Sequence, residues 1–211
     1  MKYRIVYQFK WFIVIWLLLL IYLSNLILIK LPFVSIVYPS LLQILLPKVD
    51  FEFQIYNIQT IIVWISGILF GPEMGFLTLS IYLLLGFLGL PVFASGGGID
   101  YYKEPTFGYL ISLPLLAYLS GLFYEQNKKL LAVFIPIFTT HLFGILYLLL
   151  FNRSWLDITW HLSFSMVSYD LIFVLLLTPL IPFVSFFLRE IFIQEIPARD
   201  PFLEPSTRNI K

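Results

Sequence analysis

Six long apolar runs constrain the fold of this chain more than any other feature of its sequence. They cover residues 11–29, 56–70, 75–93, 107–124, 130–151 and 165–188. A membrane-spanning helix needs about 20 mostly apolar residues, with roughly 17 to 25 tolerated, and only the second run is clearly shorter. Because 60% of the 211 residues are hydrophobic and only 12% are charged, one soluble core cannot bury them all. The runs predict an all-α membrane protein with six transmembrane helices.

The placement of lysine and arginine predicts how these helices are oriented. If the N-terminus is cytoplasmic, the inner segments carry nine basic residues: Lys2, Arg4, Lys10, Lys128, Lys129, Arg189, Arg199, Arg208 and Lys211. The outer segments carry four: Lys30, Lys48, Lys103 and Arg153. Because cytoplasmic segments carry the excess of positive charge, both termini are predicted inside, in a multi-pass protein of the plasma (inner) membrane. The outward-facing segments are then residues 30–55, 94–106 and 152–164.

The chain is predicted to form a single membrane-embedded domain over residues 1–211, without an internal repeat. Residues 1–10 form a cytoplasmic N-terminus, and residues 189–211 form a flexible cytoplasmic tail. The outer segment 30–55 is largely apolar, but three prolines exclude a long helix there: Pro32, Pro39 and Pro47. Two interpretations of this segment remain open, a partly buried connector or a lid over the bundle.

Asp170 is the most informative polar residue. It lies in the stretch "SMVSYDLIF", early in the sixth run, and the next charged residue is Arg189. A carboxylate at membrane depth is costly and normally faces the bundle interior, a partner or a polar cavity. Asp170 is therefore either an acid that contacts a ligand or an interfacial residue that the dipole at the start of its helix stabilises.

Tyr82, Gly86 and Gly89 fall on one face of the third run, at spacings i, i+4 and i+7. Small residues on one face let a neighbouring helix, or a flat ligand, approach the backbone closely. Gln59, at the start of the second run, is expected near the same outer side. It either hydrogen-bonds a ligand or satisfies backbone groups of the overlying segment.

Aromatic residues are concentrated around a glycine-rich outer loop. Between residues 90 and 110 they include Phe93, Tyr101, Tyr102, Phe107 and Tyr109. Such a set can clamp a small, partly apolar molecule. It can equally form the aromatic belt found at membrane interfaces.

Several kinds of chemistry find little or no support in the sequence. The chain has no cysteine, which excludes thiolate nucleophiles and cysteine-bound metals. Asp157 and His161 could share one helical face, but two residues do not make a metal site. His141 is either a ligand or proton relay, or a residue hydrogen-bonded to a neighbouring helix. We predict no metal, no cofactor and, with a net charge of only +1, no nucleic-acid partner.

One region carries a family pattern. The stretch "GPEMGFLTLSIYLLLGFLGLPVFASGGG" is followed by "PTFGYLISLPLLAYLSG" and preceded by "IQT". It resembles the BioY family, the biotin-specific S components of energy-coupling factor (ECF) transporters. That family shows L-Q-T, G-x-x-x-G, Y-L-x-x-G-x-x-G-L-P-V-F, a glycine-rich loop and P-T-x-G-Y-L. Apart from "IQT", the matching positions here are Gly71 and Gly75, Tyr82 to Phe93, Gly96 to Gly98, and Pro105 to Leu110.

The resemblance implies six helices with cytoplasmic termini and a biotin pocket near the outer surface, with residues 30–55 as its lid. It implies an ECF transmembrane coupling protein and ATPase subunits as partners. In the family, an acid in a D-x-x-K pattern on the last helix contacts the ligand, and Asp170 occupies that acid position. We predict these substrate-binding residues: Gln59, Tyr82, Gly86, Gly89, Pro91, Phe93, Gly96, Thr106, Tyr109 and Asp170.

Two features depart from the family pattern. Phe173 stands where D-x-x-K has its lysine, and Arg153 or Lys103 could supply a positive charge from the loops instead. The stretch "WLLLLIYLSNL" lacks the A-x-x-x-A face through which S components dock on the coupling protein. We expect a non-enzymatic substrate-binding subunit of a vitamin transporter, with biotin as the leading substrate. The alternatives are the same scaffold with another small ligand, an intramembrane enzyme, or a structural subunit.

Overall fold

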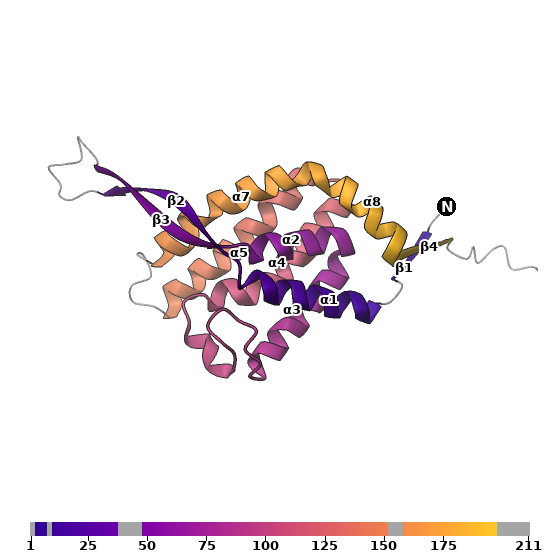
Figure 1. Ribbon diagram of the computed structural model, residues 1–211, viewed down its shortest axis with the longest axis horizontal. Helices are drawn as coiled ribbons and strands as arrows, with labels where there is room; N and C mark the ends of the chain where they lie inside the picture. The colour runs from indigo at the N-terminus through magenta and orange to yellow at the C-terminus, as the bar shows by residue number, and fades with distance from the viewer. Residues whose placement is uncertain (1–2, 8–9, 38–47, 152–157, 198–211) are drawn as a thin grey trace, which may run out of the picture.

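The computed structural model describes residues 3–7, 10–37, 48–151 and 158–197. Helices dominate these residues and form one elongated bundle (Figure 1). The α-helices are α1 (Lys10–Ser24), α2 (Gln59–Phe70), α3 (Pro72–Phe87), α4 (Phe107–Glu125), α5 (Lys129–Phe151), α7 (Met166–Leu177) and α8 (Ile181–Phe192). The shorter helical turns are the 3-10 helices η2 (Ile99–Lys103) and η4 (Thr178–Leu180) and the π-helix η3 (Trp160–Phe164).

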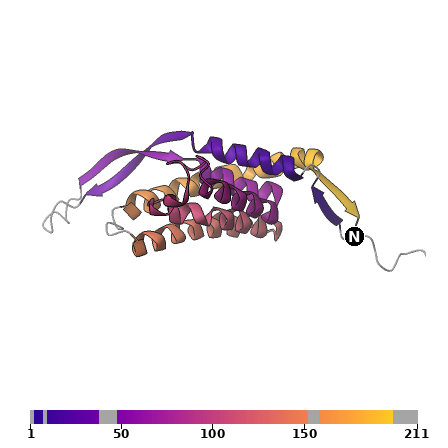
Figure 2. The ribbon, with the colours of Figure 1, turned by 90° about the horizontal axis from the view of Figure 1, so that it is seen from below.

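Two antiparallel pairs of strands correct the prediction of an all-α fold. Strand β2 (Leu28–Val37) pairs with β3 (Lys48–Asn57), and β1 (Tyr3–Tyr7) pairs with β4 (Ile193–Pro197). Figures 1 and 2 show the β2–β3 hairpin extending from one end of the bundle and the β1–β4 pair at the opposite end. The β3 sequence "KVDFEFQIYN" alternates apolar and polar residues, which is the period of a strand rather than a helix. The fold is therefore mostly helical.

The β1–β4 pair brings residues 3–7 and 193–197 to the same end of the bundle. A flexible tail was predicted from residue 189 onward. In the structure, residues 189–192 complete α8 and residues 193–197 form β4. Backbone pairing with β1 supplies order that the mixed composition of this segment does not reveal. The rest of the predicted tail, residues 198–211, lies outside the described residues.

Three described helical stretches are long and apolar enough to cross a membrane: Phe107–Glu125, Lys129–Phe151 and Leu162–Leu188. The third comprises the end of η3, α7, η4 and most of α8. Helices α1, α2 and α3 are also apolar but contain 15, 12 and 16 residues. The six predicted runs thus correspond to six helical stretches, three of which have spanning length.

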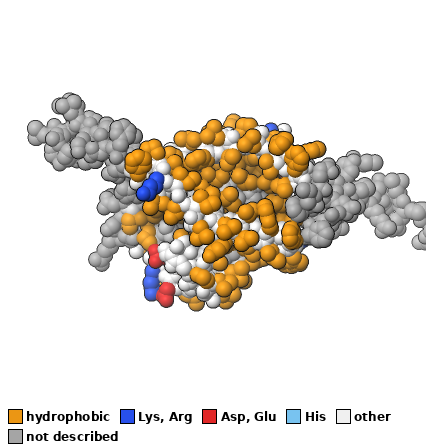
Figure 3. All heavy atoms as spheres, in the orientation of Figure 1, with side chains coloured by type: hydrophobic (Ala, Val, Ile, Leu, Met, Phe, Trp, Pro, Cys, Tyr) orange, Lys and Arg blue, Asp and Glu red, His pale blue; other side chains and the backbone are white. Residues whose placement is uncertain are grey.

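The surface of the bundle is strongly apolar. On the face shown in Figure 3, hydrophobic side chains cover the middle of the molecule and most of the visible charged side chains lie toward one end. Large apolar side chains are exposed on several helices, including Trp11 at 65%, Leu150 at 70% and Phe183 at 67%. Such a continuous apolar surface is unfavourable in water and is what contact with lipid requires. The exposed helix faces are therefore lipid-facing.

Helix α1 ends earlier than predicted, at Ser24 rather than residue 29. The Ser24 hydroxyl donates to the carbonyl of Ile21 at 2.6 Å. The Asn25 amide then donates to the Tyr82 hydroxyl at 2.8 Å and to the Val92 carbonyl at 3.0 Å. These bonds fix the chain where it leaves the helix, and the last two residues of the run, Leu28 and Ile29, begin β2.

Two prolines divide the last predicted helix. Pro179 lies in η4, and Pro182 is the second residue of α8. Proline lacks a backbone donor and clashes with the preceding turn, so the expected helix over residues 165–188 becomes α7, a 3-10 turn and α8. The apolar run continues through all three, which is why hydropathy alone merges them.

Helices α2 and α4 touch through their backbones. A Cβ atom on Gly67 would lie 2.0 Å from the Ala117 carbonyl oxygen, and one on Gly121 would lie 2.4 Å from the Gly67 carbonyl oxygen. Small residues permit this close approach between helices in a membrane. The contact fixes the relative positions of α2 and α4, whose first residues lie at the hairpin end of the bundle.

The glycine-rich loop folds back onto the end of α3. The Gly98 amide donates to the Gly86 carbonyl at 2.7 Å, and Phe93 and Gly96 exchange backbone bonds of 2.9 and 3.1 Å. Gly96 and Gly98 have φ angles of 112° and 106°, which residues with a Cβ rarely adopt. A Cβ on Gly97 would lie 2.0 Å from the Leu90 carbonyl oxygen. The three glycines therefore allow a compact turn that directs Phe93 inward.

Candidate functional site

A cavity of about 200 Å³ lies at the hairpin end of the bundle. Its wall combines side chains from β3, α2, α4, α5, η3 and α7 with three residues of the segment between α3 and α4: Ile55, Tyr56, Asn57, Gln59, Thr60, Ala94, Tyr101, Thr106, Tyr109, Leu110, Leu113, Thr140, His141, Leu162, Met166 and Asp170. Among these described lining residues, Asp170 is the only acid and none is lysine or arginine. The cavity thus combines apolar side chains with a few polar groups and one acid, as small-molecule sites usually do.

Asp170 is buried inside the bundle and bonded on both carboxylate oxygens. Its exposed fraction is 3%. The Tyr56 hydroxyl donates to Oδ1 at 2.5 Å, and Nε2 of His141 lies 3.1 Å from Oδ2. Asp170 thus lies in the interior of the bundle, on the wall of the cavity.

The bonds continue from His141 into α4 and η3. The other ring nitrogen of His141, Nδ1, lies 3.2 Å from the Ser163 hydroxyl. That hydroxyl lies 2.6 Å from the Tyr109 hydroxyl. We call these five connected side chains the acid cluster: Tyr56, Tyr109, His141, Ser163 and Asp170. All except Ser163 line the cavity.

The order Ser163, His141 and Asp170 is the order of a hydrolytic triad. A triad nucleophile must, however, face the space where substrate binds. Ser163 is 2% exposed, does not line the cavity, and its oxygen is engaged by Tyr109 at 2.6 Å. The arrangement therefore suits hydrogen bonding to a bound molecule, with Asp170 as the acceptor at the wall, rather than nucleophilic attack.

A second set of polar side chains lies beside the cavity, around the Tyr82 hydroxyl. This hydroxyl donates to the Val92 carbonyl at 2.8 Å and accepts from Gln59 at 3.1 Å and Asn25 at 2.8 Å. The Asn57 amide donates to Asn25 Oδ1 at 3.2 Å. We call this set the amide cluster: Asn25, Asn57, Gln59 and Tyr82. It joins α1, β3, α2, α3 and the loop through neutral groups only.

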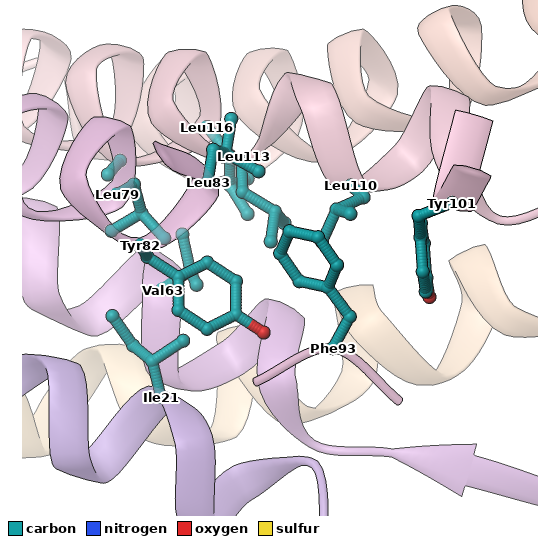
Figure 4. Close-up of a cluster of buried hydrophobic side chains, with 11 residues drawn as sticks. Ile21, Val63, Leu79, Tyr82, Leu83, Phe93, Tyr101, Leu110, Leu113 and Leu116 are labelled. Carbon is teal, nitrogen blue, oxygen red and sulfur yellow. The ribbon is translucent and has the colours of Figure 1, made fainter. Parts of the chain in front are cut away.

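Phe93 fills the space next to Gly86. A Cβ on Gly86 would lie 2.0 Å from Cζ of the Phe93 ring. Figure 4 shows this ring between the side chains of Tyr82 and Tyr101, with centroid separations of 5.5 and 4.7 Å. Phe93 is 4% exposed and does not line the cavity. Gly86 on α3 therefore accommodates an aromatic side chain of the loop that follows the helix.

The ten predicted binding residues divide into two groups in the structure. Four line the cavity: Gln59, Thr106, Tyr109 and Asp170. The other six do not line it: Tyr82, Gly86, Gly89, Pro91, Phe93 and Gly96. Their positions build the loop and the end of α3 that close this side of the bundle.

Other lining residues were not predicted. Tyr56 and Asn57 belong to β3, whose residues were predicted to lie partly in the outer segment 30–55 and partly in the second apolar run. His141 was left with two roles, and the structure shows its bonds to η3 and α7 as well as its place on the wall. The alternation in β3 was the available signal for Tyr56, since it places every second side chain of the strand on one face.

The family pattern has a lysine where this chain has Phe173, and Lys103 and Arg153 were the two residues expected to supply a positive charge instead. The Phe173 ring packs on the Tyr56 ring, with centroids 5.4 Å apart. Lys103 is exposed and bonded to Asp100 at 2.6 Å, and Arg153 lies outside the described residues, as does Asp157. Among the described residues no group of three or more histidines or acids could hold a metal ion.

Comparison with known proteins gives a consistent family. A model described as the BioY family matches residues 10–189. The "Probable biotin transporter BioY" of Pyrococcus horikoshii is 37% identical over 101 residues, covering 47% of this chain and 57% of that protein. The protein of the same name from Lysinibacillus sphaericus is 35% identical over 124 residues, covering 56% and 61%.

A "Biotin transporter BioY" from Thermotoga maritima is 37% identical over 75 residues, covering 35% of this chain and 44% of that protein. These three matches thus span between 44% and 61% of the relatives' lengths. Among solved structures, the S-component for biotin from an ECF-type ABC transporter aligns over 86% of this chain and 90% of its own, with 21% identity and a TM-score of 0.44.

The family match confirms the resemblance to the BioY family seen in the sequence, and the three helical stretches of spanning length agree with the predicted multi-pass membrane location. The matched range, residues 10–189, includes every element except the two end strands and the last turn of α8. The chain belongs to the BioY family.

Proposed function

We propose that the chain is the biotin-binding subunit of an uptake transporter of the plasma membrane. Membership of the BioY family supports this proposal, together with relatives named as biotin transporters. The observation that carries it is the cavity, whose described lining combines one buried acid with apolar and neutral polar side chains.

The chemistry of the cavity fits that of biotin. The bicyclic ring of biotin contains a urea, whose N–H groups are donors, and a sulfur-containing ring that is apolar. An ionised carboxylate accepts through about four lone-pair positions, and Tyr56 and His141 take one on each oxygen of Asp170. The remaining positions can accept the ligand's N–H groups, while Leu110, Leu113 and Met166 contact its apolar ring.

Partners and orientation complete the proposal. An S component of an ECF transporter carries no ATPase of its own, so a coupling protein and ATPase subunits energise it. The β1–β4 end is proposed to face the cytoplasm, and the hairpin end the outside. Residues 30–55, whose described parts belong to β2 and β3, then act as a lid over the cavity.

A binding measurement with the purified protein tests the substrate. Isothermal titration in lipid nanodiscs is expected to give a dissociation constant for biotin below micromolar. A thermal-shift screen against a panel of vitamins should give its largest shift with biotin, because a ligand stabilises the fold according to its concentration relative to Kd. Affinity weaker than micromolar would reject biotin as the substrate.

The same screen tests a second candidate, another small ligand on the same scaffold. The observation that favours this candidate is Phe173, whose ring lies on Tyr56 where the family pattern has a lysine. In that case another vitamin would give the largest shift, and Asp170→Ala would abolish that shift.

A further inference from the structure

We propose that His141 is a positioning residue for ligand recognition, which holds the Asp170 carboxylate in a fixed plane. Ser163 and Tyr109 in turn fix the nitrogen through which His141 donates. This inference rests on the proposed function, since it specifies how the same cavity recognises its ligand.

Both ring nitrogens of His141 have a hydrogen-bond partner. The side chain is buried, with 6% of its surface exposed, and each ring nitrogen has one partner, Asp170 for Nε2 and Ser163 for Nδ1. The Tyr109 ring meets the His141 ring edge-on, with centroids 5.8 Å apart. The imidazole is thus held on three sides, and rotation of the ring would break both bonds.

The hydrogen bonds of His141 have a defined direction when Asp170 is ionised and His141 is neutral. An ionised carboxylate can only accept, so Nε2 of a neutral His141 carries the hydrogen that it donates to Asp170. Nδ1 is then an acceptor, and the Ser163 hydroxyl must donate to it. The Ser163 oxygen in turn accepts from the Tyr109 hydroxyl. With Asp170 ionised and His141 neutral, donation runs in one direction, from Tyr109 through Ser163 and His141 to Asp170.

Two local features of the helices allow these hydrogen bonds to form. Gly144 follows His141 by three residues on α5, and a Cβ there would lie 2.2 Å from the Tyr109 ring. Glycine at this position lets Tyr109 reach Ser163. Ser163 belongs to η3, a π-helix, and π-helical turns often place side chains at functional sites.

The consequence concerns the oxygens of Asp170 that a ligand can use. Tyr56 binds Oδ1 and His141 binds Oδ2, so the carboxylate is held at both ends and its plane is fixed. A ligand N–H then meets an acceptor that does not have to be reoriented on binding, which lowers the entropic cost of association. Without His141, the carboxylate keeps one partner and can rotate.

The test compares three substitutions of His141 in the full-length protein. His141→Leu removes both bonds and should weaken biotin binding about 10- to 100-fold, as expected for a hydrogen bond to a charged group. His141→Gln keeps an N–H donor near the Nε2 position and should stay within about threefold of wild type, whereas His141→Asn is too short and should behave like leucine. Leu142→Met, an exposed neighbour on α5, serves as the matched control.

A second ligand separates positioning from a general structural role. An analogue of biotin with methylated ureido nitrogens has already lost the N–H groups that Asp170 accepts. His141→Leu should therefore reduce the preference for biotin over this analogue by about the same factor as it reduces biotin affinity, because the effect acts through Asp170. Ser163→Ala should reduce the same preference by a smaller amount, about 2- to 10-fold.

The possible results distinguish the two proposals. Equal losses for biotin and the analogue, or an unchanged affinity in His141→Leu while wild type binds biotin, would overturn the positioning role and leave the proposed function intact. Failure of wild type to bind biotin would overturn both. If His141→Leu does not fold, equal affinities of His141→Gln and His141→Asn would still overturn the positioning role, and rescue by glutamine alone would support it.

Discussion

The acid cluster and the amide cluster lie beside the same cavity but differ in charge and in how completely they are bonded. In the amide cluster, the Tyr82 hydroxyl donates to one group and accepts from two, so it has no lone pair left for a ligand. In the acid cluster, the Asp170 carboxylate accepts one bond on each oxygen and keeps further acceptor capacity. The difference teaches that the Tyr82 hydroxyl, with all its positions used, serves to join elements, whereas the Asp170 carboxylate keeps positions that a ligand can use.

The largest loss of biotin affinity is expected from Asp170→Ala. This change should reduce biotin affinity by more than about 100-fold, because it removes the acceptor and leaves Tyr56 and His141 without their buried partner. Titration calorimetry on the inserted, monodisperse protein measures the effect. Asp100→Asn, which alters an exposed acid, is the control, and an unchanged affinity in Asp170→Ala would remove the acid cluster from the site.

The next largest effect is expected from Gly86→Leu. The added side chain would occupy the position of the Phe93 ring, expelling it from its place against Tyr82 and Tyr101. Overpacking of this kind typically costs about 1–3 kcal/mol, and the displaced loop should weaken biotin binding and uptake. Thermal unfolding and uptake assays check this, with the exposed position Leu84→Met as control. Normal uptake together with a normal Tm would contradict the packing described for Phe93.

Tyr56→Phe should have a moderate effect. The change removes the hydroxyl that donates to Asp170 at 2.5 Å but keeps the ring contact with Phe173. Because this bond ties β3 to α7, its loss should speed dissociation of biotin by roughly 3- to 10-fold with little change in the association rate. Stopped-flow kinetics measure both rates. A slower dissociation would mean that the Tyr56 hydroxyl competes with the ligand for Asp170.

Tyr82→Phe should lower the stability of the fold while leaving biotin affinity nearly unchanged. It removes three hydrogen bonds of the amide cluster, so the free energy of unfolding should fall by about 1–3 kcal/mol. Biotin affinity of the folded protein should stay within about threefold of wild type, because the acid cluster is intact. Chemical denaturation and calorimetry give the two values. A loss of affinity as large as that of Asp170→Ala would show that both clusters recognise the ligand.

The smallest effect is expected at the exposed pair in η2. The hydrogen bond and charge of Lys103 lower the pKa of Asp100 below its ordinary value of 3.8. A lowered carboxyl pKa stabilises the fold at pH values above the ordinary pKa, and this contribution disappears as the pH falls through the lowered value. Both side chains are largely exposed, 62% for Lys103 and 87% for Asp100, so solvent screens the interaction. Unfolding of Asp100→Asn at pH 7 should match wild type, and a clear loss of stability would show that the loop depends on this pair.

The helical part of the fold could be predicted from hydropathy, because apolar runs of spanning length have few alternatives in a membrane. The runs over residues 107–124 and 130–151 differ from α4 and α5 by a single residue at one end. The predicted helix ends were wrong where residues of an apolar run pair with another strand instead of continuing the helix. Residues 28 and 29 are as hydrophobic as those before them, yet they pair with Asn57 and Tyr56 in the hairpin.

The site could be predicted in part. Asp170 stood out because a lone carboxylate in an apolar run needs a reason, and the motif "PTFGYL" pointed to Thr106 and Tyr109. The bonds to His141 and Ser163 could not be inferred, since they join residues 22 and 29 positions apart through the packing of α5 against η3 and α7. Phe93 and Gly86 were assigned to the ligand because close packing against a ring looks the same in sequence whether the ring belongs to a ligand or to the protein.

The hairpin has short connections to the helices on both sides. Only residues 25–27 separate β2 from α1, and only Ile58 separates β3 from α2. Because both connections are so short, a displacement of the paired strands relative to the bundle would be transmitted to the adjoining ends of α1 and α2. Spin labels on α1 and α2, far from the hairpin, should therefore report a displacement of the paired strands.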